Sequence, residues 1–136
     1  MKLTEYDSYN LINFYSNNGI EISEEHSFLG ASLKSFVIIK EEIIGAITLS
    51  KYKNKDFLEA IVVIPKYQKQ GISKLLLNKA LELTNKELYT ISKLDEFYLN
   101  NGFKYIEDSY DMITNNCKLC EEYKKTCHPK VMCYKK

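Results

Sequence analysis

The chain has 136 residues, of which 45% are apolar and 27% charged, and its formal net charge is +1 at pH 7. This length and composition are typical of one folded domain, residues 1–136, and exclude a disordered or fibrous protein. Because the charge is nearly balanced, nothing attracts the whole chain to nucleic acid or to an anionic membrane, and neither is expected as a partner.

The sequence shows no apolar run as long as a membrane span, and its first residues lack a secretory pattern. A cytoplasmic location is therefore expected. All four cysteines lie between positions 117 and 133. A disulfide framework in a secreted protein usually spreads its cysteines through the chain, so this clustering indicates a local device.

Apolar periodicity and turn residues predict alternating strands and helices. In chain order, the pattern predicts a helix over 7–17, strands over 35–40, 43–50 and 57–64, a helix over 72–84, a strand over 88–91, a helix from a cap at Ser92 to Leu99, and strands over 103–106 and 131–134. The buried face of the 72–84 helix is expected to carry Ile72, Leu75, Leu76, Ala80 and Leu83. The order of elements predicts an α/β or α+β fold with a mixed sheet.

The stretch from 61 to 77 is the most informative about chemistry, because a buried strand runs through a basic turn into a helix. Backbone N–H groups at a helix start have no intrahelical partner and lie at the positive end of the dipole, so phosphates bind there. Lys69 and Lys74 add positive charge, and Gly71 allows the backbone to approach closely. From these residues alone, a diphosphate site and an ordinary turn with solvated lysines both stay open.

The same stretch resembles the signature of the GNAT superfamily of acetyl-CoA-dependent N-acetyltransferases, Q/R-x-x-G-x-G/A after a strand that ends V-x-P. Gln68-Lys69-Gln70-Gly71-Ile72-Ser73 matches it, and Tyr98-Leu99-Asn100-Asn101-Gly102-Phe103 matches a second feature, Y-x-x-x-G-F. The resemblance covers about residues 1–110. It implies a mixed, mostly antiparallel sheet flanked by helices and splayed next to the 57–64 strand, with the pantetheine arm in the opening.

The resemblance implies direct transfer of the acetyl group of acetyl-CoA, the co-substrate, to a primary amine of a small molecule or peptide. The backbone of Ile61, Val62 and Val63 would hold the pantetheine and polarise the acetyl carbonyl. The diphosphate would be held by the loop and helix start, namely Gln68, Lys69, Gln70, Gly71, Ile72, Ser73 and Lys74.

Two catalytic roles also follow from the resemblance. Tyr98 matches the tyrosine that protonates the sulfur of coenzyme A, whereas without the motif it would be one more core aromatic. Glu59 is the acid inside the apolar 57–64 strand, where family members often carry a base, and alternation places it on one face with Ile61 and Val63. Glu59 is therefore a candidate general base, with an exposed residue near the start of the strand as the alternative.

Two positions depart from the family pattern. Ser73 stands where the family prefers glycine or alanine, and Ile91 stands where many members have asparagine. These departures support a second hypothesis, in which a catalytically degenerate member binds acyl-CoA or docks a protein partner. No motif identifies the amine acceptor, and a homodimer is left open.

The Cys-rich loop at 117–133 supplies candidate zinc ligands, Cys117, Cys120, Cys127 and Cys133. The Cys117-x-x-Cys120 pair fits one edge of a tetrahedral zinc site, but the remaining spacing is irregular and His128 competes as a ligand. Structural zinc, free thiols and a disulfide all remain open. A zinc module for nucleic acid is not expected, because no recognition helix is evident.

Overall fold

The computed structural model describes residues 2–20, 28, 31–52, 54–92, 95–106 and 130–136. The chain divides into two compact units, Met1–Asn85 and Lys86–Lys136. The expectation of a single domain over 1–136 stays a prediction. None of the helices in the described ranges is long and apolar enough to cross a membrane.

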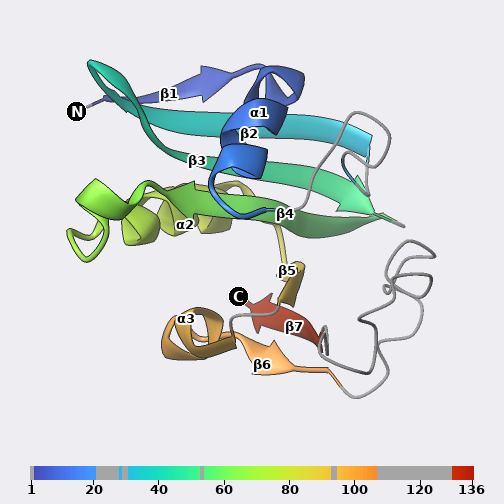
Figure 1. The fold of residues 1–136 in the computed structure, drawn as a ribbon. Helices are drawn as coiled ribbons and strands as arrows, with labels where there is room; N and C mark the ends of the chain where they lie inside the picture. The colour runs from blue at the N-terminus through green and yellow to red at the C-terminus, as the bar shows by residue number, and fades with distance from the viewer. Residues whose placement is uncertain (1, 21–27, 29–30, 53, 93–94, 107–129) are drawn as a thin grey trace, which may run out of the picture. The chain divides into compact units, whose positions relative to one another are not determined.

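The first unit is an antiparallel sheet in the order β1–β2–β3–β4, with helices on both faces (Figure 1). Its elements are β1 (Lys2–Tyr6), the 3-10 helix η1 (Ser8–Leu11), α1 (Ile12–Asn17), β2 (Ala31–Lys40), β3 (Glu42–Tyr52), β4 (Lys55–Val63), the 3-10 helix η2 (Pro65–Tyr67) and α2 (Ile72–Leu83). The predicted hairpin and third strand are confirmed. The helix expected over 7–17 begins with a 3-10 turn, in which the Asp7 side chain accepts a hydrogen bond from the Tyr9 N–H.

Strand β1 has no counterpart among the predicted elements. Four of its five residues are exposed, so it lacks the apolar alternation that marks a half-buried strand. Its pairing with β2, in which Lys2 faces Ile39 and Tyr6 faces Ser35, is therefore a tertiary feature that its own sequence does not encode.

The pairing between β3 and β4 contains a bulge at Glu59. Thr48 pairs with Ala60 while Leu49 pairs with Leu58, so Glu59 is an extra residue in β4. A bulge of this kind breaks the period of two and re-aims a side chain.

Helices α1 and α2 cover opposite faces of the sheet (Figure 1). A cluster of buried residues lies between α1 and the sheet and defines the α1 face: Leu11, Tyr15, Val37, Ala46, Ala60 and Val62. On the α2 face, a Cβ added at Gly45 would lie 3.2 Å from Ile72 and 3.3 Å from Leu76, so the helix packs closely on β3.

The buried side of α2 differs from the predicted one at three positions, because Leu77 is buried while Leu75 and Leu83 are exposed. Ile72, Leu76, Leu77 and Ala80 are buried. Leu75 and Leu83 are 55% and 41% exposed. Leu75 lies outside the arc that faces the sheet, and Leu83 is the last residue of the helix, so hydrophobic spacing alone assigned both wrongly.

The second unit contains β5 (Glu87–Ser92), α3 (Asp95–Asn100), β6 (Lys104–Tyr105) and β7 (Lys130–Lys135), with β7 antiparallel to both β5 and β6. The Phe103 ring is buried between the rings of Tyr98 and Tyr134, at centroid distances of 5.1 Å and 5.6 Å. The predicted α/β (α+β) class, with a mostly antiparallel sheet and flanking helices, is confirmed. The splay next to the 57–64 strand stays a prediction.

Candidate active site

The connection between β4 and α2 is held in shape by its own side chains. The Gln68 amide Nε2 donates a 2.9 Å hydrogen bond to the carbonyl of Val63, the last residue of β4. Gln70 reaches back in the same way to the Lys66 carbonyl at 3.4 Å. The predicted diphosphate loop is thus tied to the strand that precedes it, and the Gln68 amide is already engaged within the protein.

Gly71 ends this loop and begins α2. Its φ of +81° is in the left-handed region, where glycine is favoured, and a Cβ at this position would have no atom within 4 Å. No side chain caps the helix, which runs for 12 residues. The Leu75 N–H is the first to bond back, at 3.1 Å to the Gly71 carbonyl. The N–H groups before it therefore lie at the positive end of the dipole with open space in front of Gly71.

Positive charge gathers around the same loop. Lys69 and Lys74 are exposed, as the prediction requires. A second pair was not predicted from the sequence: Lys40 and Lys66 lie over the Tyr67 ring, 5.4 Å and 5.7 Å from its centroid. The adjacency of Lys66 and Tyr67 is visible in the sequence, whereas Lys40 comes from the end of β2 and could be found only from the fold.

The predicted pantetheine strand leads directly into this loop. Val63 pairs with Gly45, Val62 with Ala46 and Ile61 with Ile47, all on the β3 side of β4. The Ile64 N–H continues the ladder at 2.9 Å from the Ile44 carbonyl. The structure thus brings Ile61–Val63 and Gln68–Lys74 together in the first unit, and their coenzyme contacts stay predictions.

Glu59 does not lie on the face that strand alternation predicts. The bulge turns it away from Ile61 and Val63 and toward the α1 face, where its Oε2 accepts a 2.7 Å hydrogen bond from the Ser50 hydroxyl. Glu59 is half-buried and Ser50 is 5% exposed. The assignment to the Ile61 face was wrong because one inserted residue inverts the alternation on one side of it.

A chain of buried hydroxyl groups lies on the α1 face as well. Ser8 bonds to Ser35 at 2.6 Å, Ser35 to Thr48 at 2.6 Å, and Thr48 to Tyr15 at 2.7 Å. Burial raises the pKa of Tyr15, the charge of Glu59 raises it further, and the hydrogen bond with Thr48 lowers it in part, so Tyr15 stays a neutral phenol. This network was not predicted from the sequence, although hydroxyl residues inside apolar strands were a visible signal.

Tyr98 lies in α3 of the second unit and is 8% exposed. Burial raises its pKa to about 12, opposed in part by a hydrogen bond with Thr90, so the phenol holds its proton at neutral pH. Gly102, in the same motif, has a φ of +92°, and a Cβ there would lie 2.9 Å from the Tyr134 ring. The Y-x-x-x-G-F motif therefore has a packing reason as well, and the acid role of Tyr98 stays a prediction.

The candidate zinc ligands Cys117, Cys120 and Cys127 lie outside the described residues. Cys133 is in β7, where it is 5% exposed and its thiol donates to the Glu87 carboxylate at 3.7 Å. Burial and then the charge of Glu87 raise the pKa of this thiol to about 11. Within the described ranges, no group of three or more His, Cys, Asp or Glu could hold a metal ion.

Comparisons with known proteins bear on the family and the fold. A family model described as an acetyltransferase (GNAT) domain matches residues 32–105. None of the curated proteins compared is a significant match.

Three solved structures illustrate the likeness of fold. An acetyltransferase of the GNAT family from Staphylococcus aureus MU50 is 21% identical, with 98% of each chain covered and a TM-score of 0.66. An acyl-CoA N-acyltransferase from Pseudomonas aeruginosa is 13% identical, with 98% of each chain covered and a TM-score of 0.70. N-acetylglutamate synthase from Neisseria gonorrhoeae, complexed with coenzyme A and N-acetyl-glutamate, is 14% identical, with 99% of this chain and 35% of that one covered and a TM-score of 0.63.

Proposed function

Because the chain belongs to the GNAT acetyltransferase family, we propose that it transfers the acetyl group of acetyl-CoA to a primary amine of a small molecule or peptide. The observation that carries this proposal is the start of α2. An uncapped helix N-terminus with an open left-handed glycine follows a strand and lies among lysines, an arrangement suited to a diphosphate.

Each step of the transfer has a candidate group in the chain. The N–H groups of Gly71 to Ser73, with Lys69 and Lys74, bind the diphosphate, and the backbone of Ile61–Val63 orients the thioester. Glu59 accepts the proton that the amine loses as its nitrogen bonds to the acetyl carbon. Tyr98 donates its proton to the sulfur as the carbon–sulfur bond breaks. One proton is thus taken up and one released, and no other reactant is needed.

The pKa of Tyr98 and the exposure of Glu59 support these roles. Tyr98 keeps its proton until about pH 12, so a donor is present throughout the neutral range. Glu59 is half-buried rather than enclosed, so an amine can approach it. The proposal includes a cytoplasmic location and no membrane or nucleic-acid partner, and it leaves a homodimer open.

The proposal is tested by following thiol release from acetyl-CoA over a panel of amines, beside calorimetric titration with acetyl-CoA. The panel should include amino acids, because the gonococcal structure holds N-acetyl-glutamate. Binding with amine-dependent release supports the enzyme. Binding without release from any amine would favour the degenerate acyl-CoA-binding module that Ser73 and Ile91 suggest, and absence of binding would overturn both.

A further inference from the structure

The bulge in β4 leaves Glu59 on the face of Phe57 and not on the face of Ile61 and Val63. Cross-strand pairs share a face, and Ser50 pairs with Phe57 on the face that carries Thr48 and Tyr15. Glu59, two residues after Phe57, lies on the same face and reaches Ser50, whereas the bulge puts Ile61 and Val63 on the opposite face. A buried serine of β3 and a half-buried acid of β4 are thereby brought into contact.

Ser50 and Glu59 make a strong hydrogen bond. A hydroxyl that donates to a carboxylate makes a charge-assisted hydrogen bond, and the 2.7 Å between Ser50 Oγ and Glu59 Oε2 is a normal length for one. Serine has one O–H to donate, so this bond commits the donor of Ser50 to the carboxylate. Since Ser50 is 5% exposed, its own position is fixed by packing in the sheet.

The neighbouring hydroxyl groups are committed elsewhere. Ser35 bonds to Ser8 and Thr48, and Thr48 also bonds to Tyr15. Tyr15 stays neutral, because burial first and the charge of Glu59 second raise its pKa. The α1 face therefore carries two separate hydrogen-bonded groups. Ser8, Ser35, Thr48 and Tyr15 bond to one another. Ser50 bonds to Glu59, which is half-buried and so is reached by solvent.

We propose that Ser50 is a positioning residue that holds the Glu59 carboxylate in the orientation from which it receives the proton of the amine. The inference rests on the proposed function, because it assigns Ser50 to the same reaction. A carboxylate on a flexible two-carbon stem loses efficiency as a base when it is not held, so the bond contributes to kcat rather than to coenzyme binding.

The experiment compares Ser50→Ala, Ser50→Thr and Ser35→Ala with the wild-type chain in the thiol-release assay. We expect S50A to lower kcat about tenfold, the equivalent of a hydrogen bond to a charged group, with the KM for acetyl-CoA within about twofold. S50T keeps the hydroxyl and should recover most of the rate. S35A removes an equally buried serine of the same face that does not bond to Glu59, so it should lower the melting temperature and leave kcat within about twofold.

A double-mutant cycle with Glu59→Gln separates positioning from a structural role. If Ser50 acts through Glu59, S50A should lower kcat no further in the E59Q background. A full tenfold loss in that background, a loss equal to that of S35A, or no rescue by S50T would overturn the inference while the enzyme itself stays established. Absence of amine-dependent release by the wild-type chain would overturn the proposed function and this inference together.

Discussion

The start of α2 and the α1 face of the sheet use hydrogen-bond donors in opposite ways. At the start of α2, the N–H groups before Leu75 have no cap, and the space in front of Gly71 is open. On the α1 face, the hydroxyls of Ser35, Thr48 and Tyr15 bond to one another inside the core. A helix start without a side-chain cap is suited to a ligand, whereas hydroxyl groups bonded to one another in a core stabilise a fold. Changes in the first region should therefore alter binding, and changes in the second should alter stability.

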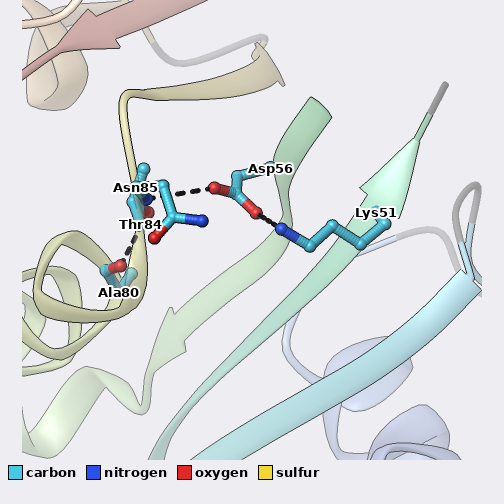
Figure 2. Close-up of polar contacts among 5 residues, drawn as sticks. All are labelled: Lys51, Asp56, Ala80, Thr84 and Asn85. Carbon is cyan, nitrogen blue, oxygen red and sulfur yellow. Dashed lines mark hydrogen bonds and ion pairs between the residues drawn. The ribbon is translucent and has the colours of Figure 1, made fainter. Parts of the chain in front are cut away.

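A third pattern appears where the chain leaves α2 (Figure 2). The Asp56 carboxylate accepts hydrogen bonds from Lys51 and, at 3.3 Å, from the Asn85 N–H, while the Thr84 hydroxyl donates to the Ala80 carbonyl at 2.8 Å. The bond from Asn85 to Asp56 ties the chain just after α2 to the β3–β4 hairpin. Side chains make hydrogen bonds at the C-terminal end of α2, whereas no side chain caps its start. The two ends of α2 therefore differ in the same way as the two regions compared above.

The largest effect is expected from Gly71→Ile. The φ of +81° is unfavourable for a β-branched residue, and the added side chain would fill the space assigned to the diphosphate. We expect acetyl-CoA affinity to fall beyond detection, at least about 100-fold, while circular dichroism shows a folded chain. Gly19→Ile is the matched control, because Gly19 also has a positive φ and nothing within 4 Å of a Cβ. Equal affinity in the two variants would remove the basis of the diphosphate site.

The next effect concerns turnover. Tyr98→Phe should keep acetyl-CoA affinity and lower kcat by roughly 100-fold, because loss of a general acid commonly costs that much. The pKa of about 12 means that the wild-type rate should show no loss from ionisation of Tyr98 in the neutral range. The control is Tyr105→Phe, a 46% exposed tyrosine of the same unit. An unchanged kcat in Y98F would show that Tyr98 is not the proton donor and only packs against Phe103.

Glu59→Gln should produce a smaller loss that depends on pH. Glutamine cannot accept the proton that the amine loses, but at high pH hydroxide from the solvent can accept it instead. The ratio of wild-type to variant kcat should therefore be largest near neutrality and shrink as the pH rises. A ratio that is the same at every pH would show that Glu59 does not act as the base, and would place the Ser50–Glu59 pair with the stabilising network.

The sequence was most informative where function depends on local structure. The turn before Gly71 and the helix after it follow from adjacent residues, and they were predicted from their order alone. Glu59 was singled out correctly as an unusual acid but placed on the wrong face, because a bulge depends on the pairing of two strands and has no local signal. The polar edge strand β1 and the contact of Lys40 with Tyr67 were missed for the same reason, since each depends on residues far apart in the chain.

The smallest effect on activity, and the clearest on stability, is expected from Thr48→Val. Valine has nearly the same shape but cannot bond, so both Ser35 and Tyr15 lose a partner inside the core. Each lost hydrogen bond costs about 1 kcal/mol and each stranded hydroxyl somewhat more, so the free energy of unfolding should fall by about 2 to 4 kcal/mol. Urea denaturation measures this loss. Ser8→Ala removes a single bond at the end of the network and should cost about half as much. Acetyl-CoA affinity should be unchanged in both variants, because neither residue lies in the Gln68–Lys74 loop. A loss of acetyl-CoA affinity in T48V without a loss of stability would contradict the proposed division, in which the start of α2 binds the ligand and the hydroxyl network of the α1 face stabilises the fold.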